Sequence, residues 1–155
     1  MLATLLVPIA LAQPMALDLE AVELCIGRQH LLQELDTRIT DYQTAIEGLA
    51  DTIALKEDRL LELQGRINNA TDTEATLRIQ EFNDVNTQRN AEIALLQQRQ
   101  ATLDELIDEF NALTDDYNEA CAGATYLRED VARICQANPA YGRTNWCQRL
   151  EGEGG

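Results

Sequence analysis

Apolar residues recur at alternating steps of three and four through residues 32–67. One row has members seven residues apart: Leu32, Ile39, Ile46, Ile53, Leu60 and Ile67. A second row fills the intermediate positions and is interrupted only by Lys56: Leu35, Tyr42, Leu49 and Leu63. Because the stretch contains no proline, this spacing predicts one long helix with a narrow apolar edge. Such an edge requires a partner helix, and this requirement constrains the fold more than any other feature.

The partner follows after a short break in the pattern. Apolar residues return in the same seven-residue frame: Phe82, Val85, Leu96, Leu103, Leu106, Phe110, Leu113 and Tyr117. Between the two regions, Asn68 and Asn69 are typical of a helix end, and Thr71 to Glu74 has the pattern of a capping box. A loop this short makes consecutive helices antiparallel neighbours. We therefore predict an all-α fold, with a long antiparallel two-helix coiled-coil hairpin over residues 13–124.

Folding the chain about this loop defines a register between the two helices. It places Leu35 opposite Phe110 and, on the flank, Arg66 opposite Glu81. Lys56 then faces a group of charged residues: Arg89, Glu92 and Arg99. This polar layer could bend the hairpin, admit water or bind another molecule. Alternatively, its charged groups form ion pairs, and the long aliphatic parts of their side chains cover the seam. We expect the second, with Glu92 pairing with both Lys56 and Arg89, because polar layers commonly fix register.

The N-terminal residues have the pattern of a targeting segment. Residues 2–11 are apolar apart from Thr4 and Pro8, and they are followed by Ala12. A short apolar core that ends in small residues is typical of a secretory signal peptide, and this one is too short to span a bilayer as a helix. We expect residues 1–12 to be a signal peptide. The mature chain would then be periplasmic or secreted, without insertion into a membrane.

An even number of cysteines in an exported chain favours disulfides. The chain has four, at Cys25, Cys121, Cys135 and Cys147, and these allow three pairings. The hairpin register brings Cys25 beside Cys121, so we predict a disulfide there. Cys135 and Cys147 are left to pair locally.

Residues 125–150 are predicted to form a short helix plus a disulfide loop, and residues 151–155 a disordered acidic tail. Thr125 is the expected cap of a helix over residues 126–136. The loop carries Tyr141 and Trp146, residue types that are enriched in binding hot spots. They either form a preorganised contact for a partner, or pack on the short helix as a small core.

Charge excludes several classes of function. The chain has 27 acidic and 12 basic residues and a net charge of −15, which argues against nucleic acid as a partner. Seven acidic residues follow one another without a basic one: Asp104, Glu105, Asp108, Glu109, Asp115, Asp116 and Glu119. They are spread along solvent-side positions, so a solvated face is favoured over a metal site. We expect no cofactor and no metal.

Catalysis finds no support in the sequence, because it contains no serine, a single histidine at His30 and no partnered nucleophile. We expect a structural or interaction protein rather than an enzyme: a coiled-coil adaptor, spacer or assembly factor that acts by protein–protein contact. The alternatives are a periplasmic holdase-like chaperone and a proteinaceous inhibitor of an extracellular enzyme.

Apolar residues beside the seam either broaden the intramolecular contact or support a homodimer: Leu24, Leu31, Ala45, Ile93, Leu95 and Ile107.

Overall fold

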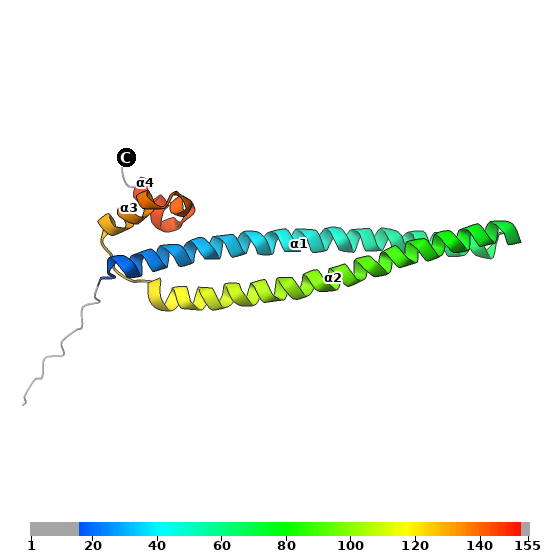
Figure 1. Cartoon of the computed structure of the whole chain (residues 1–155), viewed down its shortest axis with the longest axis horizontal. Coiled ribbons are helices and arrows are strands. Elements are labelled where there is room, and N and C mark those ends of the chain that lie inside the picture. Colours follow the sequence, from blue (N-terminus) through cyan, green and yellow to red (C-terminus); the bar gives the residue numbers. More distant parts are fainter. Residues whose placement is uncertain (1–15, 153–155) are drawn as a thin grey trace, which may run out of the picture. The chain divides into compact units, whose positions relative to one another are not determined.

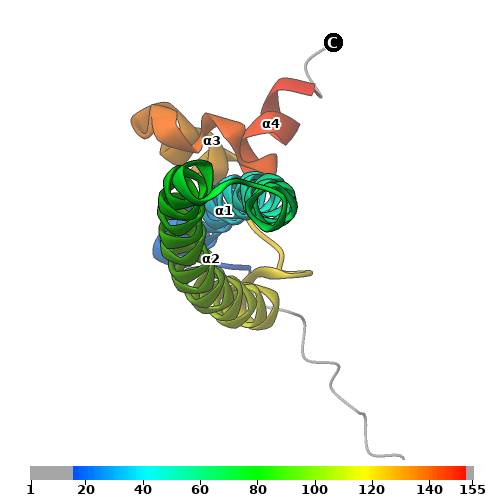
Figure 2. The same cartoon turned by 90° about the vertical axis from the view of Figure 1, so that its right-hand side faces the viewer.

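A computed structural model describes residues 16–152 and shows an all-α fold (Figure 1). The elements in order are α1 (Leu19–Asn68), α2 (Asp72–Cys121), α3 (Arg128–Ala137), the 3₁₀ helix η1 (Pro139–Arg143) and α4 (Asn145–Gly152). Residues 16–152 contain no β-strand. The two long helices pack together in antiparallel directions, as Figures 1 and 2 both show, so the predicted hairpin is confirmed. The predicted signal peptide lies outside the described residues.

The connection between α1 and α2 is as short as the sequence indicates. It consists of residues 69–71. The side-chain amide of Asn69 donates to the carbonyl oxygen of Gly65 at 2.8 Å, which satisfies a carbonyl in the last turn of α1. The carbonyl oxygen of Thr71 accepts from the N–H of Ala75 at 2.8 Å, so α2 starts directly after the predicted cap position.

The described chain divides into two compact units, which we describe separately. Residues 32–112 form the hairpin unit, which contains the turn between α1 and α2. Residues 16–31 and 113–152 form the cap unit, which contains the first turns of α1, the last turns of α2 and all the shorter helices.

The core of the hairpin unit is a single seam of predicted positions. Its buried residues are Leu35, Ile53, Leu60, Leu63 and Leu106. Other members of the predicted rows are half-buried: Tyr42, Leu49, Phe82, Val85, Leu96, Leu103 and Phe110. Only Leu63 reaches 0% exposure, because two helices alone leave most seam residues with one side open to solvent. The heptad spacing therefore predicts the packing edge correctly, and that edge is narrow.

The polar layer at Lys56 is an ion pair across the seam. The ammonium nitrogen of Lys56 lies 2.8 Å from Glu92 Oε1, and both side chains are about three-quarters buried. This pair is confirmed, but Arg89 pairs with Glu57 at 3.9 Å instead of with Glu92. The second oxygen of Glu92 is buried and has no hydrogen-bond partner among the described residues. Such a layer stabilises little on its own, but it disfavours a shifted register, in which these charges would meet apolar residues.

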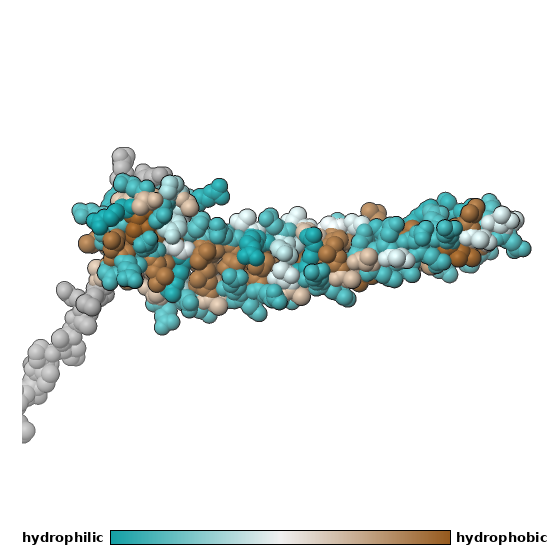
Figure 3. All heavy atoms as spheres, in the orientation of Figure 1, coloured by the Kyte–Doolittle hydropathy of each residue, from teal (hydrophilic) through white to brown (hydrophobic). Residues whose placement is uncertain are grey.

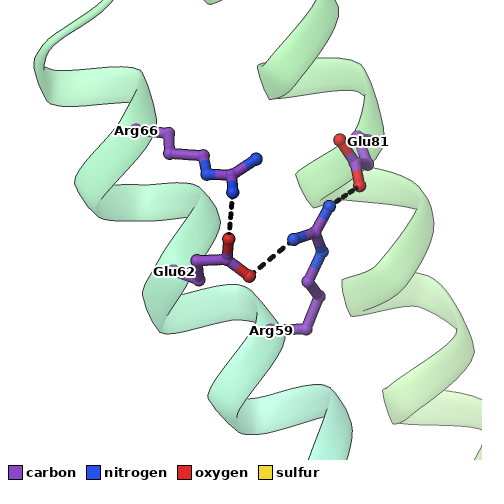
Figure 4. Close-up of polar contacts among 4 residues, drawn as sticks. All are labelled: Arg59, Glu62, Arg66 and Glu81. Atoms are coloured by element: carbon purple, nitrogen blue, oxygen red, sulfur yellow. Dashed lines mark hydrogen bonds and ion pairs between the residues drawn. The ribbon is translucent and has the colours of Figure 1, made fainter.

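A network of ion pairs joins the two helices near the turn (Figure 4). Arg59 donates to Glu81 on α2 and to Glu62 on its own helix, and Glu62 also pairs with Arg66. Arg66, which the predicted register places opposite Glu81, thus pairs with Glu62 instead of reaching across to Glu81. Arg66 pairs one turn back along α1, where an i,i+4 carboxylate lies close, and the long side chain of Arg59 reaches across to Glu81 instead.

This network makes stability depend on pH in a defined direction. The hydrogen bond from Arg59 holds the pKa of Glu62 below its ordinary value. A lowered folded-state pKa contributes stability above the pKa of the unfolded chain, and that contribution is lost as pH falls through the folded pKa. We expect Glu62→Gln to lower the melting temperature at neutral pH, and the difference from wild type to shrink in acid. The effect should be small and weakened by salt, because the side chains are exposed.

Thermal melts of wild type and Glu62→Gln from neutral to acid pH measure this difference in melting temperature. Glu47→Gln is the matched control, because Glu47 is exposed on the same helix and has no partner among the described residues. A wild-type-to-Glu62→Gln difference that stays constant from neutral to acid pH would show that the ion pairs carry no stability.

The cap unit has its own hydrophobic core. This core draws on α1, α2, α3 and α4: Val22, Cys25, Ile26, Cys121, Val131, Ile134, Trp146 and Cys147. The backbone N–H of Leu17 donates to the carbonyl oxygen of Thr125 at 2.8 Å, which ties the start of the described chain to the segment before α3. Thr125 is not the cap of α3: that position is taken by Leu127, in extended conformation and without a side-chain hydrogen bond.

The disulfide loop predicted to follow the short helix is largely helical, because it contains η1 and α4. Thr144, which is fully buried, precedes α4, and its hydroxyl donates to the carbonyl oxygen of Tyr141 at 2.7 Å. The same hydroxyl oxygen accepts from the N–H of Cys147 at 3.4 Å, which is the geometry of an N-cap. From this N-cap, α4 extends to Gly152. The first two residues of the segment 151–155, which was predicted as a disordered tail, are therefore helical. Residues 153–155 lie outside the described part.

Candidate functional site

Both predicted disulfides are confirmed. Cys25 and Cys121 join α1 to α2, and Cys135 and Cys147 join α3 to α4; the Cα atoms are 5.7 Å apart in each pair. None of the four cysteines is free. The cysteines therefore act as crosslinks, and no thiol is present in this state to serve as a nucleophile or metal ligand.

Trp146 is a centre of the cap unit and not an exposed contact. Its side chain is 8% exposed. Its indole N–H donates to the hydroxyl oxygen of Tyr117 at 2.9 Å, its backbone N–H donates to Gln29 Oε1 at 3.3 Å, and its ring lies 4.5 Å from that of Tyr126. The interpretation of Trp146 as core is thus confirmed, and its burial does not fit a direct partner contact.

Tyr141 is held differently. It lies in η1, is half-buried and packs against the cap core. Its ring meets the ring of His30 on α1 edge-on, with centroids 5.4 Å apart. Such an arrangement is favourable for aromatic pairs and fixes the orientation of η1 against α1 within the cap unit. The role of Tyr141 as a partner contact stays a prediction.

A cavity of about 530 Å³ lies beside Trp146. Its size falls within the range of small-molecule sites, roughly 300–1,000 Å³. Gly123 allows the chain to turn at the wall of the cavity, because its φ of +73° is the left-handed conformation that ends many helices. The lining residues are Gln29, Tyr117, Cys121, Ala122, Gly123, Ala124, Tyr126, Asn145, Trp146 and Arg149.

These lining residues include no carboxylate, histidine or free thiol. They supply amide, hydroxyl and guanidinium groups together with aromatic rings, which suits binding rather than acid–base chemistry. Of the lining residues, sequence reasoning named Tyr117, Cys121 and Trp146, but it missed Gln29 and Arg149. Neither belongs to a motif, and only the folding of α1 against α4 brings them to one cavity.

The acidic run of α2 faces solvent. All seven of its side chains are exposed. Within residues 16–152, no group of three or more histidine, cysteine, aspartate or glutamate residues is placed to hold a metal ion. The run is accordingly a solvated face of α2. None of the helices in the described part has the length and apolar character needed to cross a membrane.

The fold and its crosslinks define the class of the protein: an all-α, antiparallel helical hairpin with a small helical cap and two disulfides. Comparison of the chain with protein-family models, with curated proteins and with solved structures finds no match. Function must therefore be inferred from the residues and geometry of this chain.

Proposed function

We propose that this chain is an exported interaction protein, which serves as an adaptor, spacer or assembly factor by contacting other proteins. The observation that carries this proposal is a second apolar row on α1 beside the buried one. Leu24 and Leu31 are seven residues apart and therefore lie on one face of the helix, yet they are 53% and 49% exposed. Exposed apolar residues that share one face of a helix can form the contact surface by which the helix docks on a partner.

The surface and charge of the chain as a whole also support contact with a protein. Figure 3 shows apolar patches separated by hydrophilic surface along the two long helices. The partner would present apolar residues and a neutral or basic surface, because this chain carries a net charge of −15. A second copy of the chain is one such partner only if the apolar contact outweighs the repulsion between like charges.

Export is part of the same proposal. The two disulfides are compatible with an extracellular or periplasmic protein, since such bonds persist in oxidising compartments. The composition of residues 1–12 supports a signal peptide.

The two alternative functions are less well supported. An inhibitor that inserts its aromatic loop into an enzyme would need Trp146 at the surface, and Trp146 is buried. A holdase would grip clients with an apolar tip, but the turn between α1 and α2 consists largely of polar residues: Asn68, Asn69, Ala70, Thr71, Asp72 and Thr73.

Affinity capture from a periplasmic extract, with the oxidised chain immobilised, tests the proposal. We expect one stable partner, and we expect the double variant Leu24→Glu/Leu31→Glu to reduce its capture about tenfold or more, because a charge would enter the apolar contact. Leu55→Glu/Leu61→Glu is the matched control, since both leucines are more than 70% exposed and the charge change is the same.

Each outcome separates the functions. Capture of many unfolded clients would indicate a chaperone, and capture of a single hydrolase would indicate an inhibitor. Equal capture by the two double variants would remove Leu24 and Leu31 from the contact. Sedimentation of the chain alone at several concentrations shows whether the partner is a second copy.

A further inference from the structure

Two side chains at the cavity beside Trp146 have hydrogen-bond donors that no described residue occupies. Gln29 uses its amide oxygen to accept from the backbone N–H of Trp146, so its NH₂ group remains to donate. Tyr117 uses its hydroxyl oxygen to accept from the indole N–H, so its own O–H remains to donate. Both residues line the cavity.

Arg149 adds a positive charge to the same wall. It lines the cavity from α4, its side chain is exposed, and it makes no ion pair or hydrogen bond with any described residue. A guanidinium is always charged and has five N–H donors in a planar fork that matches a carboxylate. It places a positive charge at the wall of the cavity in a chain whose net charge is −15.

Aromatic rings form the apolar part of the wall. The rings of Tyr126 and Trp146 lie against each other at a centroid distance of 4.5 Å, and Tyr126 is 38% exposed. This surface can pack against an aliphatic or planar group of a ligand, while the donors hold a polar end.

We propose that this cavity binds a carboxylate carried on a compact apolar group. The carboxylate oxygens accept hydrogen bonds from Arg149, Gln29 and Tyr117, and the apolar group packs on Tyr126. The inference goes beyond the proposed function, because the cavity and the Leu24–Leu31 surface are built from different residues.

A cationic ligand is the opposing possibility. Aromatic faces attract cations, and the whole chain is acidic. However, the cation would enter beside the charge of Arg149, and a cation has no acceptor to offer to the Gln29 and Tyr117 donors. The local groups therefore favour the carboxylate.

The carboxylate has two sources with the same chemistry: a free small acid, or the C-terminal residue of a peptide. Four probes distinguish them: N-acetyl-leucine, N-acetyl-leucinamide, a pentapeptide that ends in leucine with a free carboxylate, and isopentylamine. None of them fluoresces as tryptophan does. Trp146 is the one tryptophan of the chain and lines the cavity, so its emission reports directly on occupancy.

We expect N-acetyl-leucine to change the emission of Trp146 in the full oxidised chain along a saturable curve, and the amide and the amine to bind at least about tenfold more weakly. Tighter binding of the pentapeptide would indicate a peptide terminus as the source, and equal binding a small acid. Arg149→Gln should weaken N-acetyl-leucine binding by about tenfold to a hundredfold, the usual effect of losing a charged hydrogen bond. Arg149→Lys should weaken it less.

Arg133→Gln is the matched control, because Arg133 is exposed on α3 of the same unit and does not line the cavity. It should leave binding unchanged. Equal binding of acid and amide, preference for the amine, absence of a saturable response, or an equal effect of Arg133→Gln would each overturn the proposal.

Discussion

Replacing Cys25 and Cys121 together with alanine is expected to lower the free energy of unfolding by about 4 to 5 kcal/mol. The two cysteines are 96 residues apart in sequence, so their bond removes much of the conformational freedom of the unfolded chain. A loss of this size is a large fraction of the stability of an ordinary domain. It should be especially severe for a hairpin unit whose core is a single seam. Urea unfolding followed by helical circular dichroism measures it.

The second disulfide is the control for this prediction. Cys135 and Cys147 are only 12 residues apart, so the same reasoning gives about 3 kcal/mol for the double alanine variant. The two variants remove the same atoms from the same core, which makes loop length the main difference between them. An equal loss in both, or a larger loss for the short loop, would show that chain entropy is not the main contribution of the Cys25–Cys121 bond.

Leu63→Ala is expected to destabilise the hairpin unit by about 2 to 5 kcal/mol. Leu63 is the one fully buried residue of the seam, and truncation would leave a cavity that two helices cannot easily close. Leu61→Ala is the matched control, because Leu61 lies two residues away on the same helix and is 72% exposed. Its effect should stay within about 0.5 kcal/mol. Similar losses in both variants would contradict the assignment of Leu63 to the seam.

The long-range architecture could be predicted because it follows from a local repeat. Seven-residue spacing defines the apolar edge of each helix, and a loop of residues 69–71 leaves the second helix one direction in which to return. Once the edges are aligned, Cys25 and Cys121 meet, and Lys56 finds Glu92. Each of these contacts depends on backbone position, which the repeat determines.

Ion-pair partners were harder to predict than backbone positions. The side chain of Arg59 is long enough to reach Glu81, while Arg66 finds Glu62 on its own helix. The predicted backbone register is correct at both arginines, but each flexible side chain has several carboxylates within reach and can pair with any of them. Sequence alone does not decide between an interhelical and an i,i+4 partner.

The cap unit was predicted least well, because the structure of its shorter helices depends on tertiary contacts. The short segment around Tyr141 and Trp146 has the composition of a loop. Thr144 is the N-cap of α4, but the residue three positions later is neither acidic nor an amide, so the sequence shows no capping box. The burial of Trp146 depends on Tyr117 and Gln29, which are remote in sequence. The cavity follows from the same contacts and could not be predicted.

The central claim is that the chain folds back on itself so that Cys25 meets Cys121. Non-reducing tryptic mapping by mass spectrometry tests it most directly, because cleavage after arginine places each cysteine in a different peptide. The cleavage sites that bound these four peptides are Arg28, Arg99, Arg128, Arg133, Arg143 and Arg149. We predict one crosslinked pair that contains Cys25 and Cys121 and another that contains Cys135 and Cys147. A peptide with Cys25 linked to Cys135 or Cys147 would contradict the hairpin.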